Sequence, residues 1–161
     1  MKINIFSTKG QTLKNLKIKN GKIPKLYVFK VSEYIHNNHN IINFISKNFN
    51  QDIVVRSSNY FEDKKKKSFA GYFDSVLNVS PKNKIEVKKA INKVIKSYKS
   101  YRSQNNEVLI QHMIKNAKLS GVVTTCDVKD LSPYYSININ YGSDTTAVTS
   151  GKKKYERNNY F

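Results

Sequence analysis

The feature that most constrains the fold is an amphipathic pattern running from about Ser80 to Arg102. Ser80 is a suitable N-cap, and Pro81 suits the first helical position, where a missing N–H costs nothing. Lysines lie largely on the other faces of this helix, so it is expected to bury a single stripe. That stripe consists of the apolar residues that recur every three or four positions, namely Val87, Ala90, Ile91, Val94, Ile95 and Tyr98.

Shorter helical patterns are found in the first 50 residues. A turn at 7–10 opens a predicted helix over 11–18, and Asn20-Gly21 is expected to close it. Ser32 is a good N-cap for a helix over 32–37. A separate amphipathic piece at 41–49 follows the polar stretch Asn37–Asn40.

Strand-like runs alternate with these helices and are rich in β-branched and aromatic residues. Together they predict an α+β domain with a mixed or antiparallel sheet flanked by helices. There is no internal repeat and no linker that would split the chain. The polar tail after Gly142 carries no predicted element. The strand-like runs are 2–6, 26–31, 52–57, 72–79, 108–111, 121–125 and 134–140.

The charge is strongly positive, with 29 Lys and Arg against 11 Asp and Glu and a formal net charge of +18. Only Arg56, Arg102 and Arg157 are arginines, whereas readers of bases and phosphates favour the bidentate guanidinium. The abundance of Lys, Asn and Ile indicates an AT-rich coding sequence, and we prefer this explanation to a polyanion site. We therefore expect no specific nucleic-acid partner.

No apolar run is long enough for a membrane span, and the N-terminus lacks the apolar core of a secretory signal. The single cysteine, Cys126, excludes a disulfide framework, fits a reducing cytoplasm and is expected to be a small buried hydrophobe. His36 and His39 lie in an Asn-rich stretch without a third ligand, so a surface loop is the better interpretation than a metal site. The chain has no P-loop, no GxGxxG and no common hydrolase motif.

A few scattered residues suit a triphosphate. Lys9 stands in a turn at a helix start, where free backbone N–H groups favour an anion. Arg56 ends an apolar strand and could form two hydrogen bonds to phosphate oxygens. Residues 68–71 form a small-residue loop that could close over a ligand. Taken singly, these residues are better explained as a surface lysine, an arginine paired with Glu62 or Asp63, and an ordinary turn.

The order of these motifs along the chain resembles the ATP-binding domain of pyruvate phosphate dikinase and phosphoenolpyruvate synthase. The similarity covers nearly the whole chain in collinear order, and several short motifs agreeing together are more specific than any one. The residues that carry it are Lys9-Gly10-Gln11 with Leu13 and Leu16, Ile23-Pro24, Val54-Val55-Arg56-Ser57-Ser58, Glu62-Asp63, Ser68-Phe69-Ala70-Gly71, Ser75 to Val79, Val108 to Ile114, and Ser120 to Thr125.

The resemblance implies an ATP-grasp-like fold that binds ATP. By this resemblance, Lys9 and Arg56 would bind the phosphates of ATP. Ser68, Ala70 and Gly71 would belong to a mobile loop over them. Gln111, Met113 and Ile114 would lie on the strand whose backbone faces adenine.

The sequence also departs from the dikinase pattern. Ser7-Thr8 stands where dikinases carry Gly-Gly, and Asn59 replaces an alanine. Segments at 133–135, 139–141 and 149–151 resemble a divergent branch from surface-polysaccharide gene clusters, which includes a glutamine kinase for capsular phosphoramidate. This similarity implies a role in capsule polysaccharide biosynthesis, with a phosphoenolpyruvate synthase or pyruvate dikinase segment as the alternative.

The family's Mg²⁺ ligands, phosphorylated histidine and acceptor-binding domain are expected outside this chain. Residues 1–161 are therefore predicted to form one incomplete nucleotide-binding domain, with an N-terminal part at 1–50 and a motif-bearing part at 51–161. The chain is assigned ATP-binding residues but no catalytic or metal-binding ones. A non-catalytic nucleotide-binding module remains the other alternative.

Overall fold

The computed structural model describes residues 8–59, 73–99, 103, 105–126 and 132–142, together with the backbone of 157–160. Contacts divide the chain into two compact units, residues 1–113 and 114–161. Each unit is described by itself. The prediction that residues 1–161 form a single incomplete domain stays a prediction, as does its division at residue 50.

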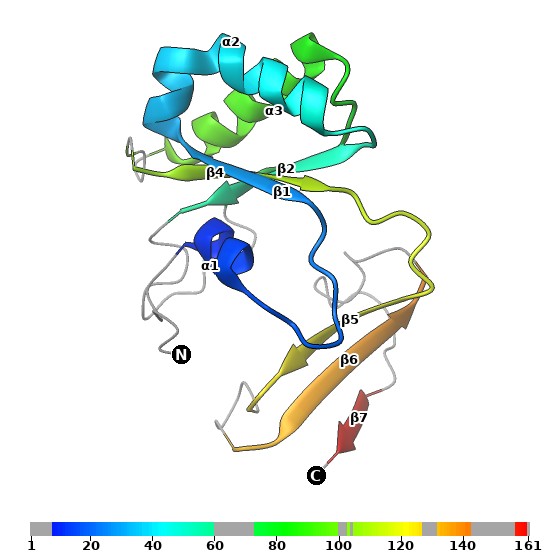
Figure 1. Cartoon of the computed structure of the whole chain (residues 1–161). Coiled ribbons are helices and arrows are strands. Elements are labelled where there is room, and N and C mark those ends of the chain that lie inside the picture. Colours follow the sequence, from blue (N-terminus) through cyan, green and yellow to red (C-terminus); the bar gives the residue numbers. More distant parts are fainter. Residues whose placement is uncertain are drawn as a thin grey trace. The chain divides into compact units, whose positions relative to one another are not determined.

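The first unit is built on a four-stranded sheet in the order β1-β4-β2-β3, in which every pair is antiparallel (Figure 1). This arrangement confirms the predicted class, an α+β fold with an antiparallel sheet flanked by helices. Strand β4 comes last of the four in the sequence but lies between β1 and β2 in the sheet. The sheet therefore depends on pairing between residues that are far apart in the chain. The strands are β1 (Leu26–Lys30), β2 (Ile53–Ser58), β3 (Ser75–Val79) and β4 (Glu107–His112).

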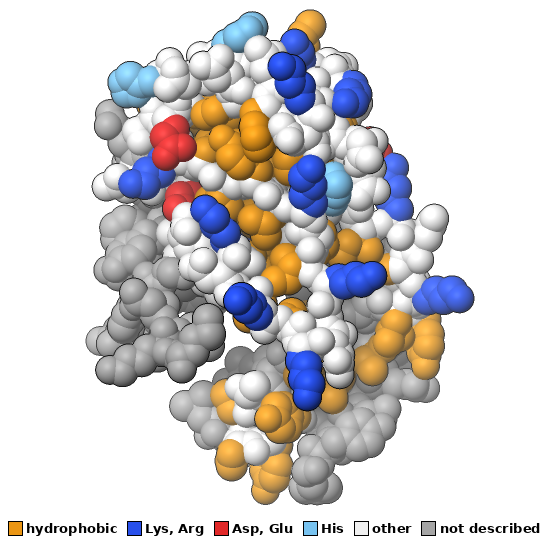
Figure 2. Space-filling view, viewed as in Figure 1, with side chains coloured by type: hydrophobic (Ala, Val, Ile, Leu, Met, Phe, Trp, Pro, Cys, Tyr) orange, Lys and Arg blue, Asp and Glu red, His pale blue; other side chains and the backbone are white. Residues whose placement is uncertain are grey.

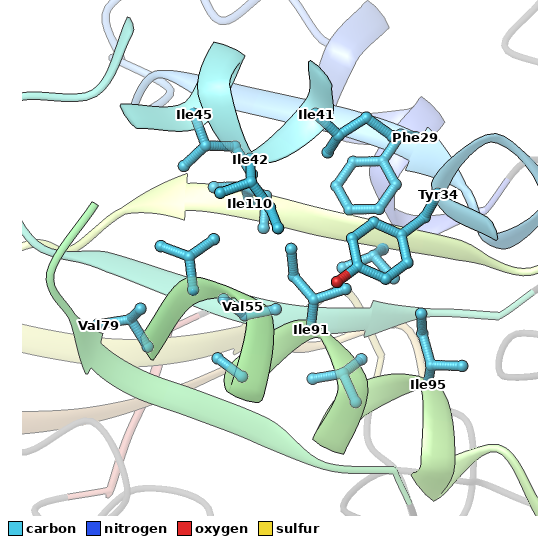
Figure 3. Close-up of a cluster of buried hydrophobic side chains, with 14 of the residues drawn as sticks. Phe29, Tyr34, Ile41, Ile42, Ile45, Val55, Val79, Ile91, Ile95 and Ile110 are labelled. Carbon is cyan, nitrogen blue, oxygen red and sulfur yellow. The ribbon is translucent and has the colours of Figure 1, made fainter. Parts of the chain in front are cut away.

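Two helices, α2 (Val31–Asn48) and α3 (Lys84–Ser97), cover one face of this sheet. Figure 3 shows Ile41, Ile42 and Ile45 of α2 lying across from Ile91 and Ile95 of α3. The remaining core comes from alternate strand residues that face the helices, chiefly Phe29, Val55, Val79, Val108 and Ile110. The predicted apolar stripe of α3 is confirmed as core.

The predicted start of α3 is wrong. Pro81 lies in a turn that the Asn83 N–H closes by donating to the Ser80 carbonyl at 3.2 Å. Asn83 is the actual N-cap, because its side-chain oxygen accepts a hydrogen bond from the N–H of Glu86 at 3.2 Å. The helix ends at Ser97 and not near Arg102, and two residues later Lys99 adopts a positive φ of 45°.

The two helical pieces predicted for residues 32–49 form one helix, α2, with non-helical dihedral angles at Asn37. Ser32 is not its N-cap. The helix begins at Val31, whose N–H donates instead to the Asn106 carbonyl at 2.7 Å. His36 and His39 are exposed, as expected for surface residues, but they lie on this helix and not in a loop.

The first helix, α1 (Lys9–Asn15), is seven residues long. It starts two residues before the predicted helix at 11–18 and ends three residues before it, because Leu16 is already extended. Asn20-Gly21 therefore does not close it. Helix α1 lies on the face of the sheet opposite α2 and α3 (Figure 1).

The second unit contains a three-stranded antiparallel sheet in the order β5-β6-β7. Strands β5 (Leu119–Thr124) and β6 (Tyr135–Tyr141) confirm two predicted strands, whereas β7 (Arg157–Tyr160) was not predicted. Cys126 follows β5 and is half-buried, so the expectation of a buried thiol is wrong. No helix among the described residues is long and apolar enough to cross a membrane. The strand predicted at 2–6 lies outside the described residues.

Candidate functional site

Three of the predicted ATP-binding residues share one face of the first unit. Arg56 pairs with Leu109 across β2 and β4, and Gln111 pairs with Val54. Their chain neighbours Val55 and Ile110 enter the helix-covered core, so by strand alternation Arg56 and Gln111 project from the opposite face. That is the face on which α1 lies, and Lys9 is the first residue of α1. We call this surface the α1 face.

Gly10 brings α1 very close to the sheet. A Cβ atom added at this position would lie 2.9 Å from Cγ1 of Val28 and 3.0 Å from Oγ of Ser58, both of which belong to strands. The Gly10 N–H donates to the Ser58 Oγ at 2.8 Å. A side chain here would push the helix start away from β2, so the sequence Lys9-Gly10 fits this close contact.

Three N–H groups in the first turn of α1 are hydrogen-bonded within the protein. Thr8 is the N-cap, and its hydroxyl accepts from the Gln11 N–H at 3.2 Å, while its carbonyl accepts from the Thr12 N–H at 2.9 Å. With Gly10 bound to Ser58, the expectation of free N–H groups for an anion is wrong at these three positions. Among the side chains at this turn, that of Lys9 is the candidate to bind an anion.

A buried carboxylate also occupies the start of α1. Glu107, the first residue of β4, is 6% exposed. It accepts hydrogen bonds from the Thr8 hydroxyl, from Gln11 Nε2 at 2.8 Å and from the Ser58 hydroxyl at 3.4 Å. A negative charge at a helix start is favourable, so this carboxylate stabilises α1 against the sheet.

Tyr98 holds the same end of the sheet from the other face. Its hydroxyl donates to the Glu107 carbonyl and accepts from the Ser58 N–H at 3.1 Å. Its ring is fully buried and packs edge-on against Phe73, with centroids 5.4 Å apart. The row formed by Ser58 and Glu107 is thus fixed from both sides, and Arg56 stands two residues along β2 from it.

The strand expected to face adenine lies in the middle of the sheet. Gln111 pairs with Leu26 on one side and Val54 on the other. Beyond it, the Met113 N–H donates to the Asp52 carbonyl at 2.9 Å. The N–H of Met113 is therefore engaged within the chain. Strand β4 ends at His112, so the prediction that Met113 and Ile114 lie on this strand is wrong, and Ile114 is 66% exposed.

The remaining predicted site residues lie outside the described residues. These are Ser68, Ala70 and Gly71, together with Glu62 and Asp63 as alternative partners of Arg56. Within the described ranges, no three His, Cys, Asp or Glu side chains gather as metal ligands. Figure 2 shows the lysines and arginines of one face spread over the surface, with no single basic patch. The +18 charge therefore does not by itself mark a site on that face.

The residues around the candidate site that sequence reasoning missed are Glu107, Thr8 and Tyr98. Glu107 stands next to a predicted strand, and a carboxylate there indicates a solvated strand end. Its burial follows from contacts with residue 8, 99 positions away, and with residue 58, 49 positions away. No local pattern contains that information.

The first unit is an antiparallel α+β fold, and its α1 face carries two candidate phosphate-binding residues, Lys9 and Arg56. The family model of the pyruvate phosphate dikinase AMP/ATP-binding domain matches residues 6–156. The chain therefore belongs to this family of nucleotide-binding domains. No curated protein matches its sequence.

Among solved structures, the chain is similar to a protein from Pyrococcus horikoshii Ot3, PH1788, with 21% sequence identity and a TM-score of 0.40. The aligned part covers 76% of this chain and 46% of that protein. The chain thus corresponds to less than half the length of this relative.

Proposed function

We propose that this chain is the ATP-binding N-terminal segment of a phosphoenolpyruvate-synthase-like phosphotransferase, and that it binds the phosphates of ATP on the α1 face through Lys9 and Arg56. The observation that carries the proposal is that a family of AMP/ATP-binding domains matches 6–156, while the two cations lie on one face. Phosphoryl transfer depends mainly on positioning and on neutralising charge, which two fixed cations supply.

The local geometry supports this assignment. Gly10, next to Lys9, is bonded to Ser58, and Arg56 is two residues away on the same strand and face. Two strand residues span about 7 Å, so both cations attach to the fold within a short distance of one another. Both would approach the same nucleotide, whereas the α1 turn itself offers its Gly10, Gln11 and Thr12 N–H groups to the protein.

The proposal is tested by calorimetric titration of the full chain with Mg-ATP. Removing a charged donor to phosphate costs about 1.5–3 kcal/mol, so Lys9→Ala and Arg56→Ala should each weaken binding by roughly ten- to hundredfold. If the wild type binds no better than the double variant, the site assignment fails.

A matched control separates this site from general attraction to a cationic chain. Lys88→Ala with Lys89→Ala removes the same two charges from exposed positions on α3, across the sheet from the α1 face. This variant should bind Mg-ATP as the wild type does. Equal loss in both double variants would show that net charge, and not the α1 face, holds the nucleotide.

Magnesium is expected to enter with the nucleotide. Since the described residues form no cluster of three metal ligands, none of them is assigned to the ion. A bound Mg²⁺ would neutralise phosphate charge, and its protein ligands are proposed to lie in a downstream part of the protein, together with the phosphohistidine and acceptor-binding domains.

The acceptor is proposed to be an amide nitrogen, with glutamine as substrate in capsular polysaccharide modification. Support comes from the similarity of 133–135, 139–141 and 149–151 to the capsule-linked branch. The test is ³¹P NMR of the intact multidomain protein with Mg-ATP and either glutamine or pyruvate. A phosphoramidate signal with glutamine supports this acceptor, and phosphoenolpyruvate supports the dikinase alternative. ATP binding without either product would favour a non-catalytic module.

A further inference from the structure

We propose that Glu107 is a positioning residue for nucleotide binding, acting through Lys9. This proposal rests on the proposed function. It starts from the burial of the Glu107 carboxylate, whose described partners are the hydroxyls of Thr8 and Ser58 and the side-chain amide of Gln11. These donors come from the two segments that carry the phosphate-binding cations.

The carboxylate joins α1 to β2. Thr8 precedes Lys9 and Gln11 follows it by two residues, so Glu107 binds side chains on both sides of Lys9. Ser58 completes the connection, because its hydroxyl donates to Glu107 and accepts from the Gly10 N–H at 2.8 Å. The Lys9 backbone is thereby fixed to the strand that carries Arg56.

A carboxylate suits this role better than a neutral group. It offers only acceptor sites, and all three of its partners here are donors. A glutamine would replace one acceptor oxygen with a donor NH2, so either the Gln11 side-chain amide would have to turn over or the Thr8 and Ser58 hydroxyls would have to reverse their direction.

Helix α1 depends on this connection because it is short. Seven residues are too few for a helix to be stable alone, so its position is set by its contacts with the sheet. The contact at Gly10 is already close, with no room for a side chain. Loss of the carboxylate would release the α1 turn while the α2–α3 core on the opposite face stayed packed.

The test is a double-mutant cycle on the full chain, with Mg-ATP affinity as the readout. Glu107→Gln should weaken binding about tenfold, or about 1.4 kcal/mol, in the wild-type background. In the Lys9→Ala background the same change should alter binding by less than about twofold, because the residue that it positions is gone. Equal weakening in both backgrounds would overturn the proposal.

A second measurement does not depend on nucleotide. Amide hydrogen exchange should show faster exchange at Gly10 and Gln11 in Glu107→Gln, with α3 amides unchanged. Unchanged exchange at Gly10 would overturn the positioning role. Failure of wild-type ATP binding would instead overturn the proposed function, so the two failures are distinguishable.

A matched control accounts for a general loss of stability. Ile91→Val removes one methylene from the buried α3 side of the core and should destabilise the chain by a modest amount. It should leave Mg-ATP affinity and the exchange at Gly10 unchanged. A loss of affinity in Ile91→Val as large as that in Glu107→Gln would show that stability alone explains the effect and would overturn the proposal.

Discussion

The two sheets of this chain use similar alternating sequences and reach different degrees of burial. In the first unit Ile53, Val55 and Ile110 are 0% exposed, because α2 and α3 cover their face. In the second unit Val123 and Tyr141, which lie on one face of β5 and β6 by register, are 60% and 81% exposed. The second unit has no helix among its described residues.

Alternation of apolar and polar residues along a strand therefore does not by itself create a core. Strand pairing satisfies the backbone in both sheets, but apolar burial needs a second layer. The first unit obtains that layer from two amphipathic helices. Its opposite face remains available for α1 and for the polar connections at Ser58 and Glu107, so the structural core and the candidate site are separated by one sheet.

The largest difference in unfolding free energy is expected when an apolar strand residue is truncated to alanine in each of the two sheets. Ile110→Ala should cost about 2–5 kcal/mol of unfolding free energy, because it leaves a cavity between the sheet and the helices. Val123→Ala should change stability by no more than about 0.5 kcal/mol. Urea denaturation followed by circular dichroism would measure both. Similar losses in the two variants would contradict the contrast in burial.

The next comparison removes a single hydroxyl from a tyrosine in each unit. Tyr98→Phe leaves the Ser58 N–H and the Glu107 carbonyl without this partner and should cost about 1–3 kcal/mol. Tyr141→Phe alters an 81% exposed ring and should be nearly neutral.

Tyr34→Phe is the matched control within the first unit. Among the described residues, the buried Tyr34 hydroxyl has no hydrogen-bond partner, so its removal should be neutral or stabilising. A loss as large as that of Tyr98→Phe would show that the packing of the hydroxyl group, and not its hydrogen bonds, underlies both effects.

A smaller effect is expected from serines in the two sheets. Ser58→Ala removes a group that bonds both Gly10 and Glu107, and should cost about 0.5–1.5 kcal/mol. Ser120→Ala loses one long hydrogen bond to the Asn140 carbonyl at 3.4 Å and should cost less. Thermal unfolding of both variants would rank them. A larger loss of stability for Ser120→Ala would contradict the structural role assigned to the Ser58 hydrogen bonds on the α1 face.

The smallest effect is a pH dependence confined to the first unit, because no histidine lies in 114–161. Burial, and secondarily the charge of Lys25, lowers the pKa of His112 below its ordinary value of 6.5. The unfolded chain therefore binds the proton more readily, and stability should fall as the pH drops below about 6.5.

The pH effect can be assigned by substitution. His112→Gln should reduce the slope of stability against pH between about 7 and 5, and His39→Gln, an exposed control, should not. Denaturation midpoints across this range provide the measurement. An unchanged slope in His112→Gln would exclude this histidine as its source.

Much of the fold could be predicted from local patterns. The apolar stripe of α3 and the β-branched runs of β2 and β4 identified the layers of the first unit, because their periodicity reflects burial directly. One error lies where two local signals compete. Ser80-Pro81 and Asn83 followed by Glu86 both suit a helix start, and the structure uses the second.

Other features could not be predicted because they depend on distant partners. Strand β7 (Arg157–Tyr160) has few strand-forming residues and is defined by its pairing with β6. The motif series indicated Lys9, Arg56 and Gln111. Their common face is shown only by the strand register, for Arg56 and Gln111, and by the position of α1 in Figure 1, for Lys9. The Glu107 carboxylate, held by residues 8, 11 and 58, had no local signal at all.

Nucleotide binding on the α1 face is tested most directly by ¹⁵N NMR of the full chain titrated with Mg-ATP. If Mg-ATP binds to the α1 face, saturable chemical-shift changes are expected at Lys9, Gly10 and Arg56, with α3 amides such as Lys88 and Lys89 unaffected. Shifts that follow the lysines of α3, or that spread in proportion to exposed charge without saturation, would contradict it.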